Sequence, residues 1–289
     1  MSAPVGGTGV TTIDSCRLSY RRAGTEGPPI VLLHGGGIDD ASLSWRHTID
    51  DLADDHRVYA PDWPGYGDSD DGLEHSTESY VAILEAFLDS VGLSEDEPVT
   101  LAGISMGGAA ALGFALDHPD RVSRLVLVDS YGLGRRIPAG SLWKTLAHVP
   151  GANALGWATV GTSLEAARMG LGNVVADAGD LPRTFVEEFY DRARKPGAGR
   201  AFEAFQRVEL AGDGTALTNY ADRLESLSIP TLLVHGAADP LFPVEWSVRA
   251  ADRLPNARLE VLEDCGHWPT RERPEEFNAI LRVFLEQSS

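Results

Sequence analysis

The sequence predicts an α/β protein with a mostly parallel central sheet, helices on both faces, and a helical segment inserted into the chain. Three observations support this class. Short apolar runs alternate with segments of helical periodicity over residues 1–130. This alternation breaks over residues 131–220, where helices and loops predominate, and it resumes from residue 221. The strands are apolar along their whole length, which is typical of a parallel sheet buried on both faces.

The first part of the chain supplies most of the sheet. Strands are predicted at residues 17–22, 30–33, 57–60, 99–102 and 124–128. We expect the polar residues 1–15 to be a loose lead-in and 17–22 to be an edge strand. Residues 77–92 have helical spacing, and their apolar side chains share one face. A small-residue helix follows residue 105 and is expected to end near His118 and Pro119.

The second part completes the same sheet. Strands are predicted at 229–234 and 259–262, and an amphipathic helix at 275–286. We therefore interpret residues 1–130 and 221–289 as two parts of one core, with 131–220 inserted between them as a helical cap. The insertion is rich in aromatic side chains, so we expect it to cover the active-site loops.

The charge balance is strongly acidic. The chain has 289 residues, with 43 Asp and Glu against 24 Lys and Arg, a formal net charge of −19. Nucleic acids and anionic membrane surfaces would repel such a protein, which excludes both as partners. Lysine occurs only at Lys144 and Lys195, and the carboxylates are dispersed rather than gathered in a tail. This pattern predicts a halophilic protein from an acidic proteome; the alternative is an acidic protein of a GC-rich bacterium.

Several other classes are disfavoured. No apolar run reaches the length of a membrane span, and the N-terminal residues do not resemble a secretory signal. Two cysteines, Cys16 and Cys265, are too few for a disulfide framework. We therefore expect a cytoplasmic protein. Metal-ligand spacing, phosphate-binding loops and dinucleotide fingerprints do not occur, so we expect no cofactor and no metal.

The candidate nucleophile is Ser105. It stands in Gly103-Ile104-Ser105-Met106-Gly107, between a buried strand and a helix of small residues. This G-x-S-x-G context forms a sharp strand-to-helix turn that exposes the serine, and the flanking glycines leave room for it. The alternative is a tight turn with only a structural role.

A serine hydroxyl needs a base, and that base needs an orienting group. Asp239 follows the strand at 229–234, and His267 follows the strand at 259–262. The carboxyl ends of parallel strands meet at one edge of a sheet, so we expect both side chains to approach Ser105. Asp129, at the end of the strand at 124–128, is the alternative acid. His34, His118 and His235 are interpreted as structural, and Cys265 as a buried core residue.

Five sequence marks together resemble the α/β-hydrolase fold superfamily. They lie at residues 34–37, 62–69, 103–108, 236–243 and 266–269. The resemblance implies the α/β-hydrolase fold, with Ser105 as nucleophile, His267 as general base and then acid, and Asp239 as the residue that orients the imidazole. It also implies an oxyanion hole formed by the backbone N–H groups of Gly36 and Met106, with Gly37 as second choice.

Within this superfamily the sequence most resembles the carbon–carbon bond hydrolases that act on meta-cleavage products of aromatic catabolism. It departs from them in three segments. Ile38-Asp39 follows the glycine turn in place of Pro-Gly, Ile104 precedes the serine in place of asparagine, and Phe189 aligns with a cap arginine. Losing these polar groups would leave a charged dienoate poorly held.

We therefore predict a serine esterase that hydrolyses small, largely apolar carboxylic esters through an acyl-enzyme. The alternatives are carbon–carbon bond hydrolysis, cofactor-free perhydrolase activity, and a hydrolase-like receptor with little turnover. The predicted partner is a small-molecule substrate, and the protein is expected to be a monomer or a homodimer. The predicted pocket residues are Gly37, Ile104, Trp143, Phe189 and Trp268.

Overall fold

The computed structural model describes residues 6–93 and 96–287. Its strands form one sheet in the order β1-β2-β4-β3-β5-β6-β7-β8. β1 pairs with β2, and β2 with β4, in antiparallel fashion, and the remaining pairs are parallel. The strand bounds are β1 Gly7–Ile13, β2 Cys16–Ala23, β3 Pro29–Leu33, β4 Arg57–Pro61, β5 Val99–Ile104, β6 Val122–Val128, β7 Thr231–Gly236 and β8 Ala257–Leu262. This is the predicted α/β class, with the alternation of strands and helices confirmed.

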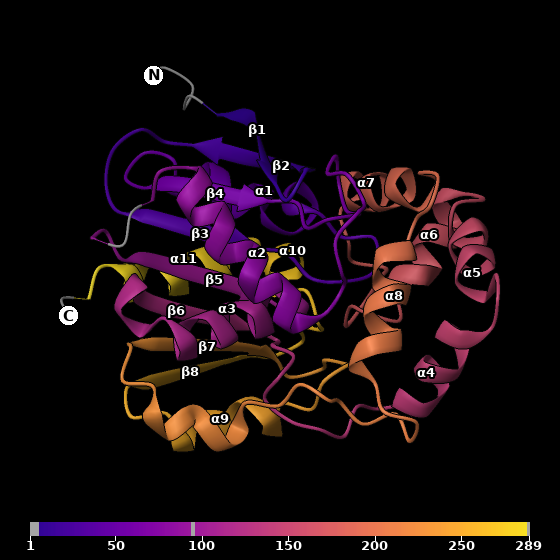
Figure 1. Cartoon of the computed structure of the whole chain (residues 1–289). Coiled ribbons are helices and arrows are strands. Elements are labelled where there is room, and N and C mark those ends of the chain that lie inside the picture. The colour runs from indigo at the N-terminus through magenta and orange to yellow at the C-terminus, as the bar shows by residue number, and fades with distance from the viewer. Residues whose placement is uncertain (1–5, 94–95, 288–289) are drawn as a thin grey trace.

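Helices cover both faces of the sheet (Figure 1). Side chains of α2 (Thr77–Ser90), α3 (Met106–Asp117) and α9 (Glu245–Arg253) pack in one apolar cluster. Those of α1 (Ala41–Leu52) and α11 (Pro274–Leu285) pack in the other. The central strands β3 and β5 are buried along their whole length, because helices cover both of their faces. Short helical turns lie at α10 (Pro269–Glu272), η1 (Pro119–Arg121) and η2 (Ala221–Ser226).

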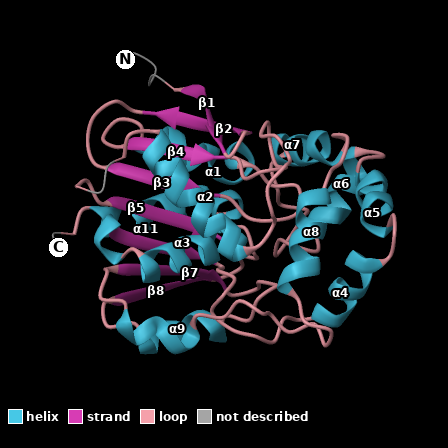
Figure 2. Cartoon of the chain, in the orientation of Figure 1, coloured by secondary structure: helices cyan, strands magenta, loops and turns pink. Residues whose placement is uncertain are grey.

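The inserted segment is helical and lies beyond one end of the strands (Figure 2). It contains α4 (Gly140–His148), α5 (Ala152–Val160), α6 (Leu164–Leu171), α7 (Arg183–Ala193) and α8 (Arg200–Glu209), all between β6 and β7. These are called the inserted helices below. Within the described ranges, no helix combines the length and apolarity needed to cross a bilayer.

The N-terminal expectations were wrong. Residues 7–13 form β1, which pairs with β2 from Gly7 opposite Arg22 to Ile13 opposite Cys16. β2 is therefore the second strand of the sheet and not its edge. The sequence contains little indication of a strand here, because residues 7–13 are mostly polar and include Gly9. In the structure, the ring of Tyr20 lies against Gly9. The lead-in residues 1–5 lie outside the described residues. The structure also adds α1, which begins where the Asp40 carboxylate accepts a hydrogen bond from the Leu43 N–H at 2.7 Å.

Candidate active site

Ser105 lies on a strained turn between β5 and α3. Its backbone has φ +53° and ψ −119°, in the left-handed region that residues other than glycine rarely adopt. Its N–H donates to the carbonyl of Val128 at 2.9 Å, and its carbonyl accepts from the N–H of Tyr131 at 3.1 Å. These bonds to the end of β6 and the residues after it hold the turn in place. The Ser105 side chain remains partly exposed.

The two glycines of the motif are required by close backbone contacts. A Cβ on Gly103 would lie 2.3 Å from the Gly107 carbonyl oxygen. A Cβ on Gly107 would lie 2.4 Å from the Leu33 carbonyl oxygen, which belongs to the neighbouring strand β3. Both distances are far below van der Waals contact, so these positions accept only glycine. The turn is thus fixed by its main chain.

Asp239 and His267 are brought together from the loops after β7 and β8. His267 Nδ1 lies 2.8 Å from Asp239 Oδ2, and Asp239 Oδ1 accepts from the N–H groups of Leu241 at 2.7 Å and Phe242 at 3.2 Å. Burial raises the pKa of Asp239, but His267 and these donors outweigh it and hold the pKa below its usual value. Because the carboxylate only accepts, His267 carries its proton on Nδ1 and its Nε2 can act as a base.

Ser105, Asp239 and His267 occupy one edge of the sheet. β5, β6, β7 and β8 are parallel neighbours in that order, so the loops after them lie side by side. Aromatic packing connects the Ser105 turn to His267. The Tyr131 ring packs on Phe242, and Phe242 packs edge-on against the imidazole with centroids 5.2 Å apart. Among the described contacts, the Ser105 hydroxyl makes no hydrogen bond; such bonds often form only when substrate binds.

The loop that carries His267 is held by a residue that sequence reasoning missed. The Glu272 carboxylate accepts from the N–H groups of Gly266 at 2.9 Å and Trp268 at 3.0 Å, on either side of the histidine. It also accepts from the N–H of Ala176 at 2.8 Å, between α6 and α7. His267 itself donates its N–H to the Val174 carbonyl at 2.8 Å. A glutamate four residues after Trp268, at the end of the short helix α10, was the available signal.

The glycine turn after β3 lies against the Ser105 turn. A Cβ on Gly35 would lie 3.3 Å from the Cβ of Ser105. Among the described residues, neither the Gly36 N–H nor the Met106 N–H donates to a protein acceptor. Met106 is the first residue of α3, where N–H groups have no partner within the helix. His34 is buried and structural, because its Nε2 accepts from the Trp63 N–H at 3.0 Å.

The predicted pocket residues fall into two groups. Ile104, Phe189 and Trp268 belong to one apolar cluster, in which the Phe189 and Trp268 rings lie 6.4 Å apart. Gly37 faces the Trp157 ring of α5. Trp143 lies on α4 with 37% of its surface exposed. The site is therefore flanked by apolar side chains from the inserted helices and from the His267 loop.

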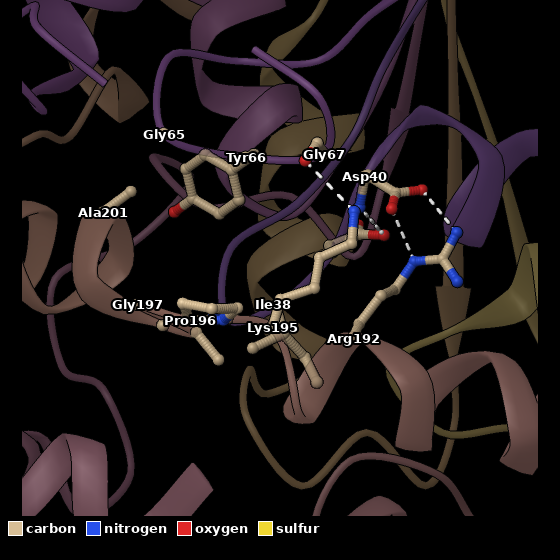
Figure 3. A pocket seen from close by; sticks show the side chains of 14 residues that line it. Ile38, Asp40, Gly65, Tyr66, Gly67, Arg192, Lys195, Pro196, Gly197 and Ala201 are labelled. Atoms are coloured by element: carbon tan, nitrogen blue, oxygen red, sulfur yellow. Dashed lines mark hydrogen bonds and ion pairs between the residues drawn. The ribbon is translucent and has the colours of Figure 1, made fainter. Parts of the chain in front are cut away.

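A cavity of about 90 Å³ lies beside the glycine turn (Figure 3). Its walls come from the loop at 37–40, the loop at 65–67 and the chain at 192–201. Arg192 of α7 reaches across it to Asp40 with two hydrogen bonds of 2.5 and 2.9 Å, which joins the inserted helices to the core. Lys195 donates to the Gly67 carbonyl at 3.2 Å. Arg192, Asp40 and Lys195 of this cavity are therefore already engaged. Asp39 accepts from the neutral donors Gly35 and Ser44.

Asp129, the alternative acid, lies close to Asp239 and His267. Each of the three side chains offers one atom that could ligate a metal, and these three atoms lie within 4.8 Å of one another. Such a cluster can bind a metal ion, but here His267 and Asp239 are already hydrogen-bonded to each other. In the described part of the chain, Asp129 Oδ1 accepts from the Gly236 N–H alone, at 3.0 Å. Asp239, with its bond to His267, is thus the acid that contacts the histidine.

Comparison with known proteins assigns the family. The family model described as alpha/beta hydrolase fold matches residues 28–274. The chain is 30% identical over 264 residues to 2-hydroxy-6-oxo-2,4-heptadienoate hydrolase of Pseudomonas putida strain F1, covering 90% of this chain and 89% of that one. It is 30% identical over 265 residues to 2-hydroxymuconate semialdehyde hydrolase of Pseudomonas sp. strain CF600, covering 91% and 88%. The chain belongs to the alpha/beta hydrolase fold family.

A solved structure agrees with this assignment. The meta-cleavage product hydrolase of Pseudomonas fluorescens IP01 superposes with a TM-score of 0.79 at 26% identity, over 96% of this chain and 97% of that one. The predicted fold and the resemblance to meta-cleavage product hydrolases are confirmed. The names of the relatives favour carbon–carbon bond hydrolysis over the ester hydrolysis that the sequence analysis put first.

Proposed function

We propose that this protein is a serine hydrolase with Ser105 as nucleophile, His267 as general base and acid, and Asp239 as the orienting acid. The observation that carries the proposal is the strained Ser105 turn at the same sheet edge as the Asp239–His267 hydrogen bond of 2.8 Å. A nucleophile, a base and a group that orients the base are the three parts that acyl transfer requires. We also propose the inserted helices as the cap over this site.

In the proposed mechanism, Ser105 Oγ attacks a substrate carbonyl carbon while His267 Nε2 takes its proton. Asp239 stabilises the imidazolium that forms. The N–H groups of Gly36 and Met106, together with the N-terminus of α3, stabilise the negative charge on the carbonyl oxygen. His267 then gives the proton to the leaving group, and the bond next to the carbonyl breaks. A water activated by His267 hydrolyses the acyl-enzyme and regenerates Ser105.

Carbon–carbon bond hydrolysis is the first candidate for the bond that breaks. Relatives that share 30% identity over nine-tenths of this chain carry names of hydrolases acting on 6-oxo dienoates and on a muconate semialdehyde. In that reaction the 2-hydroxy dienoate first converts to its 2-oxo tautomer. The carbanion that then leaves is stabilised as a dienolate, and the proton held by His267 neutralises it. The triad would be the same as for an ester.

Ester hydrolysis is the second candidate, because the apolar surroundings suit a neutral substrate. Ile104 and Phe189 are buried in an apolar cluster. The arginines near Phe189 are engaged elsewhere: Arg192 pairs with Asp40, Arg183 with Glu187, and Arg194 lies over the Tyr190 ring. A substrate carboxylate buried without a partner would bind poorly.

Two assays on the wild type and on Ser105→Ala test the proposal. Loss of the colour of 2-hydroxy-6-oxo-2,4-heptadienoate reports carbon–carbon cleavage, and release of p-nitrophenol from short esters reports esterase activity. We expect Ser105→Ala to lose on the order of 10⁴-fold or more in kcat/KM with the preferred substrate. Ser130→Ala is the matched control, since the Ser130 hydroxyl donates only to the Tyr131 carbonyl. Full activity in Ser105→Ala contradicts the proposed nucleophile.

Covalent labelling separates an enzyme from a receptor that retains the triad. A fluorophosphonate should label the wild type at Ser105 and leave Ser105→Ala unlabelled. Labelling without multiple turnover of any ester or dienoate would favour the receptor. The same assays in low and in molar salt test the halophilic character proposed from the net charge of −19.

A further inference from the structure

Asp129 is a buried acid that the proposed mechanism does not use. It follows β6, its backbone has φ +40°, and none of its surface is exposed. Its N–H donates to the Val234 carbonyl at 3.0 Å, which fixes it beside β7. A left-handed aspartate held in a buried position beside a reactive pair is the kind of strain that marks functional sites.

The two neighbouring carboxyl groups are supported very differently. Asp239 accepts from the Leu241 and Phe242 N–H groups and from His267. Among the described residues, Asp129 accepts from the Gly236 N–H alone and no donor reaches its Oδ2, although an oxygen of Asp129 lies within 4.8 Å of one of Asp239. Ionising a buried carboxyl group that has one donor and one oxygen without a donor costs free energy. Three donors, as at Asp239, stabilise the ionised form.

Among the described residues, no neighbouring cation compensates a second negative charge. His235 lies 3.5 Å from an oxygen of each acid. Its Nε2 faces the Phe242 carbonyl at 3.1 Å and therefore donates, while Nδ1 accepts from the Ser247 hydroxyl at 2.8 Å. Burial lowers the pKa of His235, which keeps it neutral.

The other groups around Asp129 oppose a charge as well. Burial and the charge of Asp239 raise the pKa of Asp129 well above its usual value, and Glu272 adds to this effect. Burial and Glu272 also raise the pKa of the Cys265 thiol, which stays neutral. His267 already shares its Nδ1 proton with Asp239.

We propose that Asp129 is a positioning residue that stays protonated and donates its hydrogen bond to the Asp239 carboxylate. The neutral acid leaves a single negative charge beside His267 and adds a fourth donor that fixes the Asp239 carboxylate toward the imidazole. The inference rests on the proposed function for its catalytic consequence, whereas the protonation of Asp129 is independent of it.

Infrared difference spectroscopy tests the protonation directly. The spectrum of wild type minus Asp129→Asn, recorded at about pH 8.5, should show the carbonyl stretch of a protonated carboxylic acid. At this pH Asp39 and Asp62, whose pKa values burial raises to about 7, are ionised and do not contribute. A difference spectrum showing only carboxylate bands overturns the proposal.

The pH profile of kcat/KM tests the catalytic consequence. An asparagine amide can donate to Asp239 and accept from Gly236 as the neutral acid does, so Asp129→Asn should retain kcat/KM within about threefold. Its acid limb should coincide with that of the wild type. An ionised Asp129 would stabilise the His267 imidazolium, so its replacement would move the acid limb to lower pH and overturn the proposal. Asp129→Ala, which lacks the donor, should lose about tenfold.

A wild-type measurement covers the case in which the variants fail to fold. Titration of ¹³C-labelled aspartate carboxyls should leave one buried carboxyl protonated at about pH 8.5, after Asp39 and Asp62 have ionised. Ionisation of every buried aspartate by that pH overturns the inference. Neither this titration nor the infrared test depends on Ser105, so failure of the proposed nucleophile, seen as activity in Ser105→Ala, remains distinguishable.

Discussion

The loops at the sheet edge and the inserted helices are built in opposite ways. In the loops, main chain packs directly on main chain. A Cβ on Gly107 would lie 2.4 Å from the Leu33 carbonyl oxygen, and one on Gly236 would lie 1.9 Å from the Gly266 carbonyl oxygen. By contrast, α5 has no buried residue, and Leu155 on it is 70% exposed.

This difference suggests that one region determines the class of reaction and the other the choice of substrate. The groups that would perform the chemistry are positioned by backbone contacts that leave no room for variation, so the reaction class follows from a short motif. The inserted helices α4 and α5 are packed more loosely, so many sequences are compatible with their fold, whereas α7 and α8 bury large side chains such as Phe189 and Phe205. If these helices form the proposed cap, we expect a change in α4 or α5 to alter substrate choice at little cost in stability.

A pair of glycine substitutions gives the largest expected contrast. Both Gly107 in α3 and Gly156 in α5 are helical, so alanine would gain helix propensity at either position. Gly107→Ala should nevertheless lose about 3 kcal/mol or more of unfolding free energy, because its Cβ would overlap the Leu33 and His34 carbonyls. Gly156→Ala has nothing within 4 Å and should be neutral or gain up to about 1 kcal/mol. Urea unfolding measures both, and equal effects would contradict the comparison.

Two arginines of α7 test how firmly the two regions are joined. Arg192 and Asp40 form a largely buried pair, with side chains 17% and 8% exposed. Arg192→Met should cost about 3 kcal/mol, because it leaves the Asp40 charge buried. Arg183 pairs with Glu187 at the surface, so Arg183→Met should cost less than about 0.5 kcal/mol. Chemical denaturation measures the unfolding free energy of both variants. A small effect of Arg192→Met would mean that the inserted helices are held to the core by apolar packing instead.

Asp39, beside the glycine turn, should give a smaller and pH-dependent effect. Burial raises the pKa of Asp39 to about 7, so the folded protein binds a proton there that the unfolded chain has released. This contribution to stability is full below the usual pKa of 3.8, decreases as the pH rises, and is lost once the pH passes about 7. Relative to wild type, Asp39→Asn should therefore gain about 1 kcal/mol between pH 6 and pH 8. A difference in unfolding free energy that does not change with pH would contradict the raised pKa.

The smallest effect is expected at Leu155. Its side chain is 70% exposed, so Leu155→Asn should change the unfolding free energy by no more than about 0.5 kcal/mol. Relative rates with short-chain and long-chain substrates, measured alongside stability, would show whether α5 contributes to selectivity. A large loss of stability would mean that α5 is anchored by contacts of Leu155, against the comparison drawn above.

The parts of the site that could be predicted are those determined by local sequence. Ser105 was identified because strand, glycine, serine, glycine and helix follow one another within a few residues. Asp239 and His267 were identified because each directly follows an apolar strand, and parallel strands end at the same edge. β1 was not predicted, because its polar, glycine-containing sequence lacks the hydrophobic pattern of a strand. It forms a strand by pairing with β2.

By itself, the sequence determined the fold class, the strained serine turn and the chain order of the three side chains proposed for catalysis. Only the tertiary structure decided which acid contacts His267, that Asp129 is buried with one oxygen that no described donor reaches, that Glu272 holds the histidine loop, and that Arg192 joins α7 to Asp40. The reason is physical. A local pattern reports the conformation of the backbone around it, whereas hydrogen bonding and burial depend on which distant segments the sheet order brings together.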